Sequence, residues 1–242
     1  MEAVKKRRIW EVDALRGLMI LCVPVAHALY YGDAVLGLFR VPAALNEFLF
    51  GWAGSLFVLL SGLSATLGSK SFRRGLIVFG CGMLLTLGSM LAVRWGLVDD
   101  TMIIRFGVLH LLGACMLLYP LLRRLPNAAL VLFGALCVGL GFWFETLTVE
   151  PGWLYPFGLR RADFSSGDYF PLFPQLGWFC FGVVLGRLCY PEKRTLLPQV
   201  NENLWILRFL RFCGRHSLLI FVLHLPVVAG ITYGLALLLG KL

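Results

Sequence analysis

The sequence predicts an all-α fold, a polytopic bundle of about seven transmembrane helices with a cytoplasmic N-terminus. Hydrophobic residues make up 59% of the 242 residues and charged residues only 14%. Soluble domains carry roughly 25% charged residues, so this composition is typical of an integral membrane protein. Two further observations support this class: the apolar residues are grouped into long runs, and Lys and Arg are unevenly distributed between the segments that join these runs.

Seven runs approach the ~20 apolar residues that a helix needs to cross a bilayer. They are residues 10–31, 45–67, 75–96, 102–121, 127–146, 171–189 and 216–239. The stretch LWILRFLRF (204–212) sets two arginines among large apolar side chains and predicts a helix in the membrane interface, over about 201–213. No internal repeat divides the chain, so we expect one integral-membrane domain over residues 1–242.

The basic residues indicate the orientation of these runs. With the N-terminus in the cytoplasm, fifteen of the 22 Lys and Arg residues fall in cytoplasmic segments and six in outer segments, while Arg16 lies within the first run. The positive-inside rule therefore favours a cytoplasmic N-terminus and an outer C-terminus. The same bias explains the formal net charge of +9 without a nucleic-acid partner, and no nucleic-acid-binding motif is present.

The sequence lacks the motifs of several other chemistries. It contains no GxSxG, HExxH, Walker or dinucleotide-binding pattern. None of the seven cysteines forms a CxxC pair, and most lie within apolar runs, so we interpret them as packing residues. Three of the four histidines fall on different runs, and the fourth, His216, lies at the interface. We therefore expect no bound metal.

The first run carries ionisable residues on one helical face. Arg16 and His27 are eleven residues apart, which is about 20° beyond three full turns and ~16 Å along the axis. Asp13 lies three residues before Arg16, close enough to pair with it. Because charges in lipid cost free energy, this face should point into the protein or a wet cavity. A path for a polar ligand, a structural ion pair and a packing histidine are all compatible with the pattern.

Further polar residues lie within or beside other runs. They are Arg105 and His110 at the outer start of the fourth run, Asp168 and Tyr169 before the sixth, and His224 within the last. Each is a candidate for binding an acceptor or supporting the site, and each could equally serve packing. The outer segment 147–170 is rich in aromatic and turn-forming residues, and it either caps an external pocket or forms an ordinary interfacial loop.

Five blocks along the chain resemble the heparan-alpha-glucosaminide N-acetyltransferase catalytic-domain family. They are EVDALRGLMILCVPVAH (11–27), LFVLLSGLSATL (56–67), RFGVLHLLGACMLL (105–118), SGDYFPLFPQLGWFCFGVVLGR (166–187) and GRHSLLIFVLHLPV (214–227). DYFPLFPQLG is the most specific of these, and the likeness extends over about residues 9–230. The spacing of Arg16 and His27 is also similar to a motif of the wider acyltransferase-three superfamily.

The resemblance implies a membrane-bound acyltransferase, which we expect in a bacterial inner membrane. Acetyl-CoA would enter from the cytoplasm, and the acceptor would be a sugar or envelope glycan, through an amine or hydroxyl, on the other side. The basic residues that would hold the CoA phosphates are Lys70, Arg73, Arg74, Arg123 and Arg124. Arg16 would hold the pantetheine arm or a phosphate.

The resemblance also suggests the catalytic group. His27 would act as general base, with Arg16 and Asp13 on the same face. In the eukaryotic members Asn stands at the position of His27, and the working histidine lies a little later. Residues 32–46 contain no histidine in this chain, so His27 takes that role through its spacing from Arg16.

Other classes of function remain open at this point. A small-solute transporter or channel would use the same polar face as a permeation path, although no matching pair of interrupted helices supports it. A non-catalytic membrane partner is a third possibility. Glycines spaced like Gly182 and Gly186 let membrane helices approach closely, which would permit a homodimer.

Overall fold

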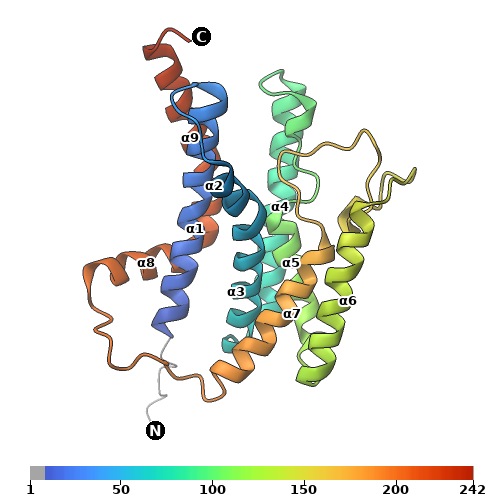
Figure 1. The fold of residues 1–242 in the computed structure, drawn as a ribbon, viewed down its shortest axis with the longest axis vertical. Coiled ribbons are helices and arrows are strands. Elements are labelled where there is room, and N and C mark those ends of the chain that lie inside the picture. Colours follow the sequence, from blue (N-terminus) through green and yellow to red (C-terminus); the bar gives the residue numbers. More distant parts are fainter. Residues whose placement is uncertain (1–8, 242) are drawn as a thin grey trace. The chain divides into compact units, whose positions relative to one another are not determined.

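A computed structural model describes residues 9–241, and the regular structure of this part of the chain is helical, as predicted (Figure 1). The α-helices are α1 (Trp10–Tyr30), α2 (Ala43–Glu47), α3 (Ala53–Leu67), α4 (Ser71–Arg94), α5 (Val108–Leu122), α6 (Asn127–Glu145), α7 (Leu172–Cys189), α8 (Trp205–Arg215) and α9 (Ser217–Leu238). A π-helical turn, Tyr31–Val35, continues α1, and another, Phe48–Trp52, leads into α3. Short 3-10 turns lie at Asp100–Met102 and Tyr155–Phe157.

Six helical segments are long and apolar enough to cross a membrane. They are Trp10–Ala34, Ala43–Leu67, Ser71–Arg94, Asn127–Glu145, Leu172–Cys189 and Ser217–Leu238, and they match six of the seven predicted runs. The remaining run, predicted over 102–121, forms α5, which has only 15 residues. Its length of ~22 Å is less than the ~30 Å of a bilayer's hydrocarbon core. The count of seven crossings therefore stays a prediction.

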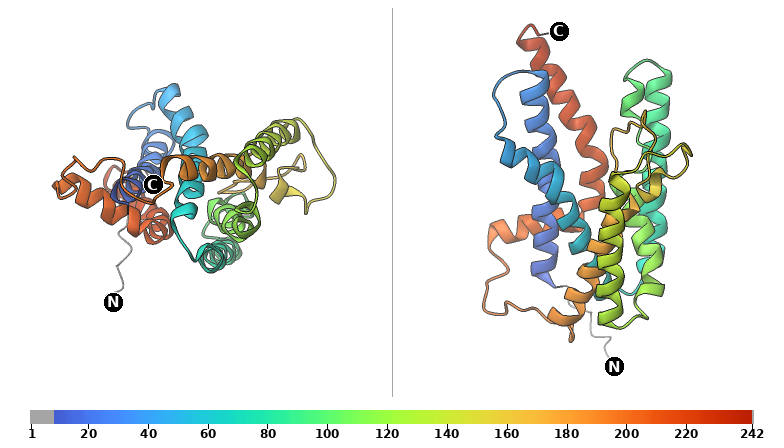
Figure 2. Two further views of the ribbon diagram at one scale, coloured as in Figure 1. Left: turned by 90° about the horizontal axis from the view of Figure 1, so that it is seen from below. Right: turned by 45° about the vertical axis from the view of Figure 1, so that its right-hand side comes forward.

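The chain forms two compact units. Unit 1 combines Met1–Phe57 with Glu192–Leu242, and unit 2 is Val58–Pro191. In unit 1, α1 and α9 run parallel and side by side (Figures 1 and 2). Arg16 donates a hydrogen bond to Ser217 near the start of both helices, and at their far ends Lys241 donates one to the carbonyl of Leu36.

Helix α8 crosses α1 where both helices carry a glycine. A Cβ atom on Gly17 would lie 1.9 Å from the carbonyl oxygen of Leu210, and one on Gly214 would lie 1.8 Å from that of Asp13. The backbones of α1 and α8 are therefore in direct contact, which only glycine permits at these two positions.

Neighbouring helices in unit 2 alternate in direction. Helices α4 and α5 are antiparallel, since Gly75 of α4 lies against Leu117 and Gly82 lies against His110. Helices α6 and α7 are also antiparallel and lie side by side (Figure 2). Helix α7 runs parallel to α3, because Gly182 packs on Leu59 while Gly186 packs further along, on Thr66. The predicted close approach at these two glycines is thus an intramolecular contact.

A non-helical segment, residues 103–107, leads into the short α5 and is paired with residues 165–170. The peptide N–H of Gly167 donates to the carbonyl of Ile103, and that of Phe170 donates to the carbonyl of Phe106. Side chains satisfy the intervening groups: Ser166 accepts from the N–H of Arg105, and Ser89 from that of Ile104. Irregular backbone is tolerated next to a membrane span only where its polar groups are satisfied in this way.

The carboxylate of Asp168 completes this pairing at the start of α5. Its Oδ2 accepts from the backbone N–H of Val108 at 3.0 Å, which satisfies one of the unpaired donors of the first turn. A Cβ atom on Gly107 would lie 2.0 Å from the same oxygen, so glycine leaves room for the carboxylate. Burial of this carboxyl group raises the pKa of Asp168 to about 6.

Replacement of Gly182 by alanine tests the α3–α7 contact. The new Cβ would lie 1.8 Å from the carbonyl oxygen of Leu59, so the helices must separate, and we expect a loss of about 1–3 kcal/mol of stability. The measurement is thermal unfolding of the purified protein in detergent. The matched control is G139A in α6, where a Cβ meets no atom within 4 Å and we expect unchanged or slightly higher stability. Equal melting temperatures for the two variants would contradict this packing.

The pH dependence of stability tests the environment of Asp168. Because its pKa is about 6 when folded and ~3.9 in an unfolded chain, the folded protein holds more protons between these values. The contribution of Asp168 to stability therefore falls as pH rises from about 4 to 6. We expect D168N to remove this step and to melt a few degrees above wild type at pH 7.5. The control is D163N, because Arg161 lowers the pKa of the exposed Asp163. Parallel wild-type and D168N profiles would exclude a titrating Asp168.

Candidate active site

Helices α1 and α9 bring together two histidines that are far apart in the sequence. The ring centroids of His27 and His224 are 4.9 Å apart, with an angle of 66° between the ring planes. The ring of Phe50 lies 6.1 Å from that of His27. His224 is buried and His27 is half-buried. The predicted candidate base thus has a second imidazole as its direct neighbour.

The hydrogen bonds of the two rings define where their protons lie. The Nδ1 atom of His27 is 3.0 Å from the carbonyl oxygen of Val23, and Nδ1 of His224 bonds the carbonyl oxygen of Phe221. Carbonyl oxygens only accept, so Nδ1 must be the donor in both rings. A neutral ring then carries its lone pair on Nε2. The buried Nε2 of His224 makes no hydrogen bond within the described part of the chain. The pair therefore presents two imidazoles whose basic nitrogen is Nε2.

The other two residues of the predicted polar face lie nearer the start of α1. Arg16 donates from Nη2 to the hydroxyl of Ser217, at 3.2 Å, and Ser217 is buried. Asp13 is also buried, and its Oδ2 lies 3.5 Å from Nε of Arg215. Arg16 and His27 thus both contact α9, and this face of α1 points into unit 1 as the sequence suggested.

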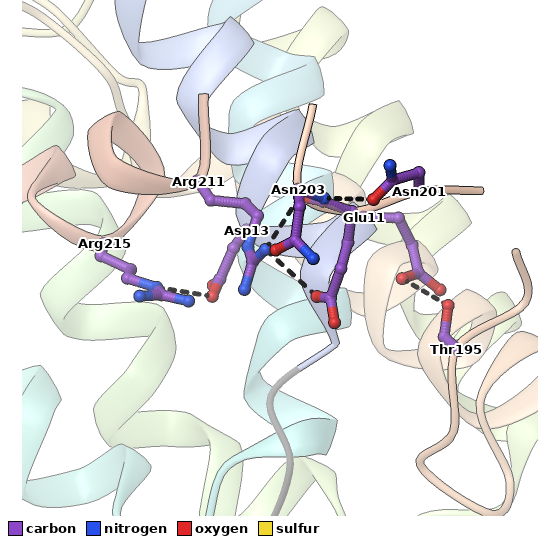
Figure 3. A network of polar contacts seen from close by, with 8 residues as sticks. Glu11, Asp13, Thr195, Asn201, Asn203, Arg211 and Arg215 are labelled. Carbon is purple, nitrogen blue, oxygen red and sulfur yellow. Dashed lines mark hydrogen bonds and ion pairs between the residues drawn. The ribbon is translucent and has the colours of Figure 1, made fainter. Parts of the chain in front are cut away.

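A polar network that the sequence did not reveal surrounds this end of α1 (Figure 3). Buried Glu11 accepts from the hydroxyl of Thr195 at 2.9 Å and from the N–H of Leu196 at 2.8 Å. Arg211 of α8 forms an ion pair with Glu202 at 3.1 Å. The only sign of this network in the sequence is Glu11, an acidic residue two positions before Asp13. Its partners could not be predicted, because they lie more than 180 residues further along the chain.

In unit 2, His110 differs from the histidine pair. Its Nδ1 accepts from the N–H of Gly107 at 3.2 Å, and its Nε2 lies 3.3 Å from the hydroxyl of Thr86. That hydroxyl donates to the carbonyl of Ile104, so Nε2 of His110 is the donor to Thr86. The ring also lies 5.5 Å from those of Phe79 and Phe106. Both nitrogens are engaged, and His110 holds the start of α5 in place.

The remaining outer candidates, Arg105 and Tyr169, both bond backbone carbonyls of the segment 147–170. Arg105 donates from Nε to the carbonyl of Ser165 at 3.0 Å. The hydroxyl of Tyr169 donates to the carbonyl of Tyr155 at 2.7 Å, and the Arg160 guanidinium lies 5.5 Å from its ring centre. Burial raises the pKa of Tyr169 to about 12. Together with Asp168, these residues order the segment 147–170 against the start of α5.

The five predicted CoA-binding residues gather at the opposite end of unit 2. Lys70, Arg73 and Arg74 lie at the start of α4, and Arg123 and Arg124 follow the end of α5. Because α4 and α5 are antiparallel, these two groups meet at one end of the helix pair, and all five residues are exposed. We call them the basic group. Arg187 supports it by donating to the carbonyls of Arg123 and Leu125, each at 2.8 Å.

The described residues contain no cluster of three or more His, Cys, Asp or Glu side chains that could hold a metal ion. The arrangement supplies two imidazoles in unit 1 and a group of exposed basic side chains in unit 2. Such groups suit proton transfer and the binding of a polyanionic substrate.

Comparison with known families confirms the resemblance that the sequence indicated. The family model described as heparan-alpha-glucosaminide N-acetyltransferase, catalytic, matches residues 8–226. The matched region includes Arg16, His27 and His224. No curated protein and no solved structure matches the chain. The chain therefore belongs to the heparan-alpha-glucosaminide N-acetyltransferase catalytic family, which implies a membrane acetyltransferase.

Proposed function

We propose that this membrane acetyltransferase moves an acetyl group from cytoplasmic acetyl-CoA to an amine or hydroxyl of a sugar on the opposite side of the membrane. The contact between His27 and His224 is the observation that carries the proposal. It joins two family blocks from opposite ends of the chain and brings two imidazole rings into contact. Family membership favours this reaction over the transporter or channel.

The chemistry needs a base next to the attacking group. The acceptor nitrogen or oxygen attacks the carbonyl carbon of the thioester, the C–S bond breaks, and CoA leaves as the thiolate. The acceptor proton passes to Nε2 of His27, whose Nδ1–H is held by the carbonyl of Val23. The resulting imidazolium lies next to the ring of His224, whose unbonded Nε2 would accept a hydrogen bond from it and lower its energy. A neutral imidazole can accept a proton or a hydrogen bond at Nε2, which suits both roles.

The direction of the helices supports seven crossings, with α5 included. Three helices, α4 to α6, separate α3 from α7 in the chain, and α3 and α7 are parallel. Parallel spans are separated by an odd number of crossings, which favours a crossing by α5 as well. The parallel pair α1 and α9 favours the same count, with five crossings from α3 to α7. The distribution of Lys and Arg then favours a cytoplasmic N-terminus, which puts the basic group on the cytoplasmic side.

The basic group would bind the phosphates of CoA. Guanidinium groups form paired hydrogen bonds with phosphate oxygens, and the five side chains are exposed at one end of the α4–α5 pair. Arg16, near the start of α1 in unit 1, would hold the pantetheine arm or a phosphate. Acetyl-CoA is the donor substrate in this proposal, and no metal takes part.

Substitution of either histidine tests the catalytic pair. We expect H27A to lower turnover by about 10²–10⁴-fold, because a positioned general base contributes about this much. H224A should lower turnover less, by roughly tenfold, since it removes one hydrogen-bond acceptor worth about 1.4 kcal/mol. The measurement is release of CoA thiol from acetyl-CoA in the presence of glucosamine and other simple sugars.

The matched control for both variants is H216A. The exposed His216 makes the same kind of bond, from Nδ1 to the carbonyl of Phe212 at 2.9 Å, but lies outside the pair. We expect wild-type turnover from this variant. If H27A also keeps wild-type turnover with the same acceptor, His27 is not the base.

The double variant R73Q/R74Q tests the basic group. Loss of two guanidinium groups should raise KM for acetyl-CoA by about tenfold and leave kcat close to wild type. Acetyl-pantetheine, which lacks the nucleotide phosphates, should be used equally well by the variant and by wild type. R161Q serves as control, because Arg161 is exposed and paired with Asp163 at the other end of unit 2. A lowered kcat with unchanged KM would place these arginines outside the donor site.

A further inference from the structure

Helix α8 exposes an aromatic surface that nothing in unit 1 covers. Trp205 is 78% exposed, Phe212 is 58% exposed and Phe209 is 50% exposed. At 100° per residue these three side chains fall within about 60° of one another on the helix. Ile206 beside them is also exposed. Contiguous exposed aromatic side chains of this kind mark a surface that meets another apolar medium.

The arginines of α8 form a separate row. Arg208, Arg211 and Arg215 also fall within about 60° of one another, next to the aromatic surface but not within it. The third side of the helix, with Leu210 and Gly214, faces α1. Helix α8 therefore has three faces: one packed on protein, one aromatic and one basic.

The orientation of α8 about its own axis is fixed. Gly214 packs on the backbone of Asp13, and Gly17 packs on the backbone of Leu210. Two ion pairs hold the basic face: Arg215 lies 3.5 Å from Asp13 (Figure 3), and Arg211 lies 3.1 Å from Glu202. The helix cannot turn its aromatic side chains towards α1 without losing these contacts.

The position of α8 in unit 1 indicates what it meets. It runs across α1, which is a candidate membrane span, near the end where α1 and α9 both begin (Figure 1). A helix lying across the end of a span runs along the membrane surface. Its aromatic face can then enter the boundary between headgroups and acyl chains, where Trp is favoured.

Charge points to the kind of lipid. Segment 192–216 contains five Lys and Arg residues against two Glu. Arg208 is exposed at the border of the aromatic surface, where lipid phosphates would lie. We propose that α8 is a membrane-surface helix that seats its aromatic face in the bilayer interface and binds anionic lipid headgroups through Arg208 of its arginine row. This inference does not depend on the acetyl transfer proposed above.

The first experiment measures the depth of Trp205. The full chain is reconstituted in nanodiscs of phosphatidylcholine and phosphatidylglycerol, with bromine placed high or low on the acyl chains. The fluorescence of Trp205 is obtained as the difference between wild type and W205F. We expect about half or more of it to be lost with bromine high on the chains and little with bromine near their ends. Quenching of this component by aqueous iodide, with no quenching by brominated lipid, would overturn the proposal.

The second experiment measures the choice of headgroup. Brominated phosphatidylglycerol or phosphatidylcholine is titrated into the detergent-solubilised full chain, and quenching of Trp205 gives the apparent affinity. A basic residue near an anionic surface contributes about 1 kcal/mol, so R208Q should weaken binding of phosphatidylglycerol about fivefold. It should leave phosphatidylcholine unchanged.

The control for this experiment is R194Q. Arg194 lies in the loop before α8, paired with Glu192 and 82% exposed, so it lies outside the arginine row. We expect wild-type affinity for both lipids. The proposal would be overturned if wild type and R208Q bound phosphatidylglycerol with equal affinity. It would also be overturned if R194Q weakened this binding as much as R208Q does. A second protein copy on the aromatic surface would instead appear as a dimer in which Trp205 is quenched by neither lipid nor iodide, and this too would exclude the proposal.

Discussion

The cost of leaving a polar group unpaired in hydrocarbon is the constraint on which this structure depends. Water is absent from the bilayer core, so each backbone N–H and carbonyl group must find its partner within the protein. Long helices meet this condition by themselves. The segment 103–107 meets it through residues 165–170, through Ser89 and through the carboxylate of Asp168. The same condition distinguishes the histidines: both nitrogens of His110 are bonded, whereas the buried Nε2 of His224 makes no hydrogen bond within the described part of the chain.

The sequence predicts the spans well because each long helix satisfies its own backbone and its ends are marked by polar or turn-forming residues. The run predicted over 127–146, for instance, forms a helix over Asn127–Glu145. The prediction from sequence is wrong at the start of α5, which is predicted at 102 and observed at Val108. The reason is that the partners of the extended segment 103–107 lie about 60 residues further along the chain. No local pattern contains that information, and an apolar run looks the same whether its backbone is helical or paired with a distant loop.

The candidate site also has a part that the sequence predicts and a part that only the structure shows. Helical periodicity places Arg16 and His27 on one face, and both do contact α9. Periodicity cannot say which residues of α9 they meet. His224 stands out in the sequence as a polar residue within an apolar run, whereas Ser217 resembles an ordinary helix boundary. Their roles follow only from the parallel packing of α1 on α9. The partners of Glu11 are equally hidden, because a loop and not a helix supplies them.

The corner between α8 and α9 would connect the proposed interfacial helix to the proposed site. Helix α8 ends at Arg215, and after one intervening residue α9 begins with Ser217, the partner of Arg16. Gly17, the next residue of α1, carries the contact with α8. If α8 lies in the interface, Arg16 therefore lies near the same level. His27 is ~16 Å further along α1, which is about half of the ~30 Å hydrocarbon core. In the proposed reaction the acetyl group travels from the surface to this depth, which would suit a long, narrow carrier such as the pantetheine arm of CoA.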